Sequence, residues 1–117
     1  MQHVDIAIVG GGIVGLTLAA ALKNSELSIA VIDKAACYQP LTEKPTARVS
    51  AINQANIKAL KQFDVWNYLQ QDRANPYTDM HVWDKDSFGD IHFSCGEMGS
   101  DALGIIVENQ ALVNALA

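Results

Sequence analysis

The sequence has few of the residues that mark disulfide-rich, zinc-binding or nucleic-acid-binding proteins. Its two cysteines, Cys37 and Cys95, lie far apart and belong to no C-x-x-C pair, so neither a disulfide framework nor a zinc motif is predicted, and a reducing cytoplasm suits them. Eight Lys and Arg residues against thirteen Asp and Glu residues give a net charge of -5. Because the few cations are scattered, we expect no binding to nucleic-acid phosphates.

The chain is also short, since a folded domain needs roughly 100 to 200 residues. A two-domain enzyme therefore does not fit within 117 residues, although 50% hydrophobic and 18% charged residues are typical of a globular chain. Residues 6–22 carry no charged side chain, a pattern that an export signal or a membrane helix would share. Asp5 in place of a leading cation, and glycines at positions 10, 11, 12 and 15, argue against both.

A glycine-rich turn follows the first β-branched run. Val4–Val9 is typical of a strand buried on both faces, and a G-x-G-x-x-G string comes next, before a helix predicted over 13–23. The first glycine permits a tight turn, the second lets the backbone approach a pyrophosphate, and the third lets helix and strand pack closely. The free N–H groups and the dipole at the helix start favour a diphosphate. Candidate cofactor-binding residues here are Gly10, Gly12, Ile13, Val14 and Gly15.

A second predicted strand, Leu27–Ile32, carries an acid at its end. Asp33 follows Gly15 at close to the spacing of about 20 residues at which a carboxylate accepts hydrogen bonds from the adenosine ribose. We therefore predict nucleotide binding by a Rossmann-like strand–helix–strand unit, with Asp33 and the neighbouring Lys34 among its cofactor-binding residues. NAD and FAD share the ADP half that this fingerprint recognises, so the segment leaves both open. A glycine-rich loop without a ligand is the remaining alternative.

The middle of the chain predicts helices and then a β-hairpin. The helices are expected over 54–63, with Asn53 as a cap, and over 65–71, and Asn75-Pro76 should break the chain after them. The hairpin strands are expected over 78–84 and 90–94. Their register places apolar pairs, Val82 with Ile91 and Met80 with Phe93, on a face that covers a core.

The opposite face of this hairpin pairs His81 with His92, and Cys95 lies nearby in sequence. No third ligand has suitable spacing, so we expect a solvated or hydrogen-bonded histidine pair and no metal site. A last strand at 104–107 and a helix capped by Asn109 complete the predicted elements. Because no helix-stop signal follows, we interpret the chain as a truncated α/β fold with strand edges and helix faces left uncovered.

With these motifs in view, the sequence resembles the FAD-dependent hydroxylases of ubiquinone biosynthesis, of the VisC-like, 2-octaprenylphenol hydroxylase type. The resemblance spans essentially the whole chain and depends on VDIAIVGGGIVGLTLA at 4–19, ARVSAIN at 47–53, VWDKDSFGDIHF at 82–93 and IVEN at 106–109. It implies FAD in place of NAD and the N-terminal part of a p-hydroxybenzoate-hydroxylase-like fold. The expected division is a Rossmann-like FAD-binding part at 1–76, the start of a substrate-domain sheet at 77–104, and a return strand and helix at 105–117.

The resemblance also assigns two further cofactor-binding residues and an activity. Arg48 matches an arginine near the FAD phosphates, and Gln110 falls where the family has an Arg or Gln near the pyrophosphate and ribityl chain. The alternatives are that Arg48 is an ordinary surface cation and that Gln110 is simply a polar residue in a first helical turn. The implied reaction uses NAD(P)H and O₂ to hydroxylate an electron-rich phenol with a polyprenyl tail. No residue here reads as a general base or a nucleophile, so we name no catalytic residue.

Partners and location follow from the same resemblance. A polyprenylphenol substrate would bring a cytoplasmic chain to the periphery of the inner membrane or to a ubiquinone-biosynthesis complex, and exposed core surface favours a homo-oligomer. The family's D-G and G-D motifs are absent from the 117 residues, so we expect the chain alone to be inactive and to bind FAD weakly or not at all. An NAD-binding module of a dehydrogenase or reductase, and a non-catalytic fragment, are the alternative functions.

Overall fold

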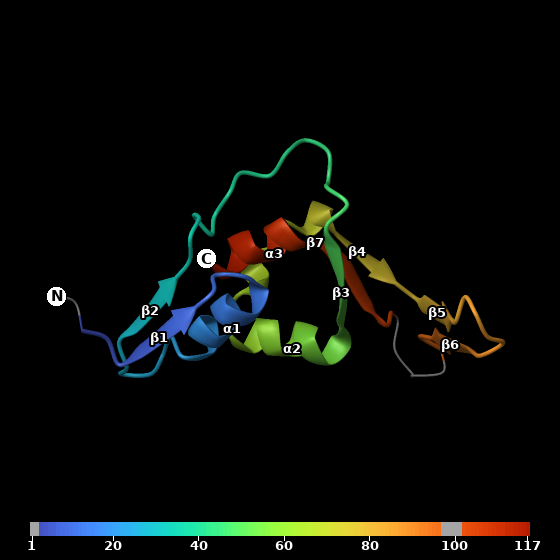
Figure 1. Ribbon diagram of the computed structural model, residues 1–117, viewed down its shortest axis with the longest axis horizontal. Coiled ribbons are helices and arrows are strands. Elements are labelled where there is room, and N and C mark those ends of the chain that lie inside the picture. Colours follow the sequence, from blue (N-terminus) through green and yellow to red (C-terminus); the bar gives the residue numbers. More distant parts are fainter. Residues whose placement is uncertain (1–2, 97–101) are drawn as a thin grey trace.

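The computed structural model describes residues 3–96 and 102–117, which form an elongated α/β molecule (Figure 1). The parallel strand pair β1–β2 lies at one end, the hairpin β5–β6 at the other, and the helices lie between them. The principal extents are 58 × 31 × 29 Å and the radius of gyration is 17.0 Å. A compact domain of this size would have a radius of gyration of about 13 Å, so the two ends project from a small central core.

The first unit has the strand–helix–strand order that the glycine fingerprint predicts. Strand β1 (Ile6–Val9), helix α1 (Ile13–Ala21) and strand β2 (Ile29–Ile32) follow one another, and the two strands pair in parallel. The prediction of a first strand buried on both faces is wrong for this chain. Ile8 is buried in β1, whereas Val9 is 84% exposed, because no further layer of the described residues covers that face.

A second, antiparallel sheet has the order β3–β7–β4. Strand β7 (Gly104–Glu108) lies between β3 (Val49–Asn53) and β4 (Ala74–Tyr77). The prediction that Asn75-Pro76 breaks the chain is wrong, because Pro76 lies inside β4, opposite Ile105. Strand β4 is an edge strand among the described residues, where the missing N–H of proline leaves no ladder hydrogen bond unmade.

The hydrophobic core forms where this sheet meets the helices. Helix α2 (Gln54–Gln62) and helix α3 (Asn109–Leu116) enclose it, and α1 packs against α3. Asn53 caps α2 as predicted, since its side chain accepts a hydrogen bond from the Asn56 amide at 2.9 Å. The helix expected over 65–71 is instead two short 3-10 turns, η1 (Trp66–Tyr68) and η2 (Gln71–Arg73). The buried core residues are Ile57, Leu60, Val65, Leu69, Ile105, Val107, Ala111, Leu112 and Ala115.

The hairpin has the predicted register. Strands β5 (Asp79–Trp83) and β6 (Asp90–Ser94) place Val82 opposite Ile91, Met80 opposite Phe93 and His81 opposite His92. The expectation that its apolar face covers a core is wrong for this chain, because Val82 and Ile91 are 52% and 56% exposed and the hairpin projects away from the helices (Figure 1).

The polar face of the hairpin holds two imidazole–carboxylate pairs. His81 Nε2 lies 2.9 Å from Asp90 Oδ2, and His92 Nε2 lies 3.4 Å from Asp79 Oδ1. Each histidine is thus paired with an aspartate across the hairpin. Within 3–96 and 102–117, no group of three or more His, Cys, Asp or Glu residues is placed to hold a metal ion.

Candidate dinucleotide site

The glycine turn between β1 and α1 adopts the geometry that its residue types favour. Gly10 has a φ of 113°, in the region that side chains disfavour, and its amide donates to the Ile32 carbonyl at 2.8 Å. Gly12 is the cap residue of α1, and no side chain caps this helix start. A Cβ atom on Gly12 would meet nothing within 4 Å. The backbone at the start of α1 is therefore open to an approaching ligand, and the helix dipole makes that position favourable for an anion.

Asp33 lies directly beside this turn. Its Oδ2 accepts a hydrogen bond from the Gly11 amide at 2.7 Å, and its Oδ1 accepts one from the Ala35 amide at 3.1 Å. The Gly11 and Ala35 amides, helped by the Lys34 charge, hold the pKa of the Asp33 carboxyl below its ordinary value of 3.8. Asp33 is therefore an anion at neutral pH, aimed at the glycine turn and exposed to solvent on its other side.

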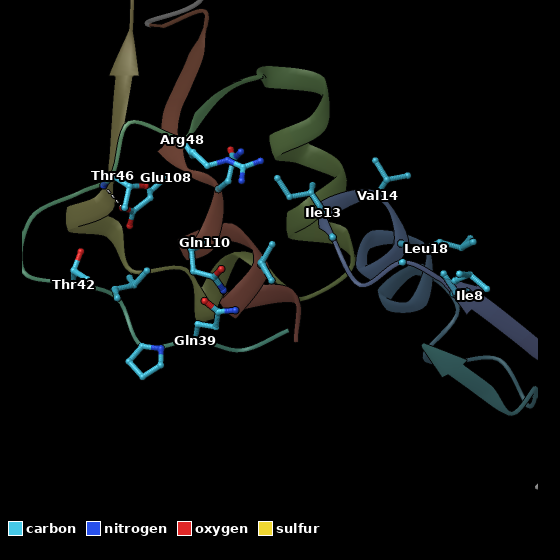
Figure 2. A pocket seen from close by; sticks show the side chains of 18 residues that line it. Ile8, Ile13, Val14, Leu18, Gln39, Thr42, Thr46, Arg48, Glu108 and Gln110 are labelled. Atoms are coloured by element: carbon cyan, nitrogen blue, oxygen red, sulfur yellow. Dashed lines mark hydrogen bonds between the residues drawn. The ribbon is translucent and has the colours of Figure 1, made fainter. Parts of the chain in front are cut away.

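A cavity of about 920 Å³ opens at the start of α1 (Figure 2). Its volume lies within the range of about 300 to 1,000 Å³ that is usual for ligand and cofactor sites. Three parts of the chain form its walls: the glycine turn with the first turns of α1, the loop 39–48 before β3, and the junction of β7 with α3. The predicted residues that line it are Gly10, Gly12, Ile13, Val14, Gly15, Arg48 and Gln110.

The other two predicted residues, Asp33 and Lys34, do not line the cavity. Asp33 nevertheless accepts a hydrogen bond from Gly11, which lies between two lining glycines, whereas Lys34 is exposed just after β2. The structure thus brings together seven of the nine predicted residues and places Asp33 next to them.

Arg48 and Glu108 are the charged residues in the cavity lining, and their environments differ. Arg48 is exposed, and within the described part of the chain its guanidinium makes no ion pair. Glu108 is 3% exposed and its Oε1 accepts a hydrogen bond from Arg73 Nη1 at 3.1 Å. Since the charge of Glu108 is neutralised by its partner, Arg48 leaves the cavity with an uncompensated positive charge.

Gln110 belongs to the first turn of α3 and uses its amide nitrogen within the protein. Its Nε2 donates to the Cys37 carbonyl at 2.9 Å and to Asn114 Oδ1 at 2.8 Å. Asn114 in turn contacts the backbone of Gln39 through both its Oδ1 and its Nδ2. Gln110 therefore lines the cavity and also joins the loop after β2 to α3, and no hydrogen bond to its Oε1 is formed by residues 3–96 or 102–117.

Sequence reasoning missed the buried acid at the end of β7. Glu108 Oε2 accepts a hydrogen bond from the Thr46 amide at 2.5 Å, and this contact, with the Arg73 charge, holds the Glu108 pKa below its ordinary value of 4.5 although burial opposes the shift. Glu108 also takes the cap position of α3 that was predicted for Asn109. That prediction is wrong because the Asn109 side chain contacts Ser50 Oγ, at 2.5 Å. A lone acid after the apolar run 105–107 was the available signal.

The comparisons with known proteins agree with this geometry. A family model described as "NAD(P)-binding Rossmann-like domain" matches residues 8–37. Among solved structures, PqsL of P. aeruginosa has a TM-score of 0.67 at 20% identity, and p-nitrophenol 4-monooxygenase PnpA from Pseudomonas putida has 0.62 at 18%. They match 98% and 99% of this chain, which covers 30% and 29% of theirs. The first strand–helix–strand unit therefore matches a Rossmann-like domain, and the chain as a whole shares its fold with part of these two proteins.

The chain also has relatives of higher sequence identity, whose names state a particular activity. Ubiquinone biosynthesis monooxygenase COQ6 of Drosophila melanogaster is 37% identical over 98% of this chain and 25% of its own length. The 3-demethoxyubiquinol 3-hydroxylase of Escherichia coli is 35% identical over 98% of this chain and 29% of its own length. The chain is thus a relative of the ubiquinone-biosynthesis monooxygenases, as its motifs indicated, and it spans little more than a quarter of their length. No helix among the described residues is long and apolar enough to cross a membrane.

Proposed function

We propose that this chain is the FAD-binding portion of a flavin-dependent aromatic monooxygenase that hydroxylates a polyprenylphenol in ubiquinone biosynthesis. The observation that carries the proposal is the uncapped start of α1 opening, at Gly12, into a cavity whose unpaired charge is the cation Arg48. A helix start and an arginine that face one cavity suit a diphosphate, because both favour the same anion.

The chain's own residues supply binding and orientation. The α1 start would hold the pyrophosphate, Asp33 would accept hydrogen bonds from the adenosine ribose, and Arg48 would contact a phosphate. Gln110, which lines the cavity, would contact the cofactor near its pyrophosphate and ribityl chain. When bound, FAD would carry electrons from NAD(P)H to O₂, which supplies the hydroxyl oxygen. No side chain of this chain takes a catalytic role in the proposal.

The preference for FAD over NAD rests on the resemblance to FAD-dependent hydroxylases, and the preference for a quinone precursor over other phenols rests on the relatives. The cavity is lined by both the glycine turn and the β7–α3 junction, so both halves of a dinucleotide can lie in it. The relatives named above act, by their names, in ubiquinone biosynthesis, and they match nearly all of this chain. The NAD(P) description of the family model concerns residues 8–37, which recognise the ADP half common to both cofactors. A polyprenyl substrate would also place the intact protein at the membrane periphery.

Ligand titration tests the cofactor. The chain would be titrated by NMR with ADP, FAD, NAD and FMN, with the intact E. coli relative as a positive control. We expect ADP and FAD to shift the amide signals of residues 10–15 and 33 and to compete with each other, with FAD bound weakly. FMN, which lacks the adenosine half, should leave these signals unchanged. Exclusive binding of NAD would support the dehydrogenase alternative and contradict the proposal.

A chimera tests the activity. This chain would replace the aligned segment of the E. coli 3-demethoxyubiquinol 3-hydroxylase, and the chimera would be expressed in cells that lack that hydroxylase. We expect the purified chimera to be yellow, to release FAD on heating, and to restore ubiquinone formation. An Arg48→Ala chimera should lose flavin, whereas Lys58→Ala, outside the cavity lining, should retain it. A well-folded chimera without flavin would contradict the proposal.

A further inference from the structure

The loop from residue 37 to residue 48 forms one wall of the cavity without any helix or strand of its own. Side chains from elements that follow it in sequence hold it in place. At one end, Gln110 and Asn114 of α3 bind the backbone of Cys37 and Gln39. At the other end, the contacts come from Glu108 and Arg73, and Figure 2 shows Thr46, Arg48 and Glu108 close together there.

Arg73 joins Glu108 to the part of the loop that includes Thr42 and Glu43. Its Nη1 donates to Glu108, while its Nη2 donates to the carbonyl of Thr42 and lies 3.5 Å from that of Glu43. The side chains of Arg73 and Glu108 are 11% and 2% exposed. Breaking such a buried pair leaves an uncompensated charge, which is more damaging than the loss of an exposed pair.

The charge that would be left in the cavity wall is negative. Glu108 lines the cavity, and its strand partner in the β3–β7 ladder is Val49, which directly follows Arg48. Without Arg73, the unpaired Glu108 carboxylate would therefore lie near Arg48 and would offset the positive charge that attracts an anionic ligand. Arg73 itself does not line the cavity, so its effect on a ligand acts through Glu108 and the loop.

We propose that Arg73 is a positioning residue for the dinucleotide site, which fixes the loop 42–46 as a cavity wall and neutralises Glu108 so that Arg48 can attract a diphosphate. This inference rests on the dinucleotide-binding function proposed above. It makes the site depend on a side chain that lies far in sequence from the glycine fingerprint.

The test compares Arg73→Met, Glu108→Gln and the double variant, with ADP as the probe and NMR as the readout of both folding and binding. We expect Arg73→Met to weaken ADP binding by about tenfold or more, because it leaves a buried anion unpaired. Glu108→Gln should weaken ADP binding by less than about threefold, since the charge that remains unpaired is the positive charge of Arg73. The double variant should bind more tightly than Arg73→Met. The control Lys23→Met breaks an exposed pair with Asp64 and should bind as wild type does.

Amide exchange separates this inference from the proposed function. In the absence of nucleotide, the Thr46 amide should exchange faster in Arg73→Met than in wild type or in Lys23→Met. Wild-type ADP affinity in Arg73→Met, a double variant no tighter than the single one, or unchanged Thr46 exchange would each overturn the inference. If the wild-type chain alone binds no nucleotide, flavin retention by the chimera decides the proposed function, and Thr46 exchange alone decides the role of Arg73. Should Arg73→Met not fold, Arg73→Lys replaces it, keeping the charge but losing the fork that reaches two acceptors.

Discussion

A Cβ atom added to Gly15 would lie 2.0 Å from the carbonyl oxygen of Gly10. Helix α1 thus rests on the end of β1 at a distance that no side chain permits. This contact fixes the angle at which the helix start meets the cavity, so the third glycine of the fingerprint acts through packing rather than through the ligand.

Gly15→Ala should therefore destabilise the protein severely. The methyl group would meet backbone atoms, which cannot move aside as a flexible side chain can, and we expect a loss of about 3 kcal/mol or more in the free energy of unfolding. Urea denaturation followed by tryptophan fluorescence measures it. A variant as stable as wild type would show that α1 can shift away from β1 at little cost.

Gly12→Ala should have the opposite profile. Nothing lies within 4 Å of the added Cβ, so we expect the free energy of unfolding to change by no more than about 1 kcal/mol. The methyl group would, however, occupy the space through which the backbone approaches a pyrophosphate, and ADP affinity should fall by about tenfold. The two glycine variants together separate folding from binding, and an unchanged ADP affinity in Gly12→Ala would place the ligand elsewhere.

Acid should remove the stabilisation that Asp33 provides. Hydrogen bonds from the Gly11 and Ala35 amides hold the Asp33 pKa below its ordinary 3.8, so the folded state binds the proton less readily than the unfolded state. The stabilisation is complete above pH 3.8 and is lost as the pH falls through the lowered pKa. Asp33→Asn should therefore be less stable than wild type at neutral pH, with a difference that shrinks in acid. Thermal unfolding of both proteins against pH measures this, and a difference that stays constant into acid would contradict the role given to Asp33.

The core centred on α3 should dominate the stability of the chain. Leu112 is 2% exposed, and Leu112→Ala should cost about 2 to 5 kcal/mol in the free energy of unfolding. Leu27 is the same residue type at 48% exposure, so Leu27→Ala should change that free energy by no more than about 0.5 kcal/mol. Equal losses in urea denaturation would mean that the first strand–helix–strand unit shares the core.

Local patterns in the sequence predicted the parts of the fold that local forces determine. The glycine string determines the turn into α1, Asn53 caps α2, and alternation of side chains gives the hairpin register with Val82 opposite Ile91. Each of these depends on residues a few positions apart. The same is true of the predicted cofactor-binding residues from Gly10 to Gly15, which lie together because one turn carries them.

Contacts between distant segments could not be predicted in this way. Arg73 and Glu108 are separated by 35 positions, and nothing in either local sequence indicates that they meet. Pro76 indicated a break because its local effect is to end strands, whereas its place at a sheet edge removes the penalty. The apolar face of the hairpin was correctly identified by its pattern, but a pattern carries no information about what covers that face.

The contacts that hold the cavity loop to α3 and to Arg73 have an evolutionary consequence. Gln110, Asn114 and Arg73 bind carbonyl oxygens of the loop, and every amino acid has such an oxygen. Substitutions at the loop positions that supply these carbonyl oxygens can therefore accumulate without loss of the hydrogen bonds, while the three side chains that donate to them are constrained. Related proteins should diverge freely along the loop and slowly at the three donor residues, even though the loop is what a cofactor would touch.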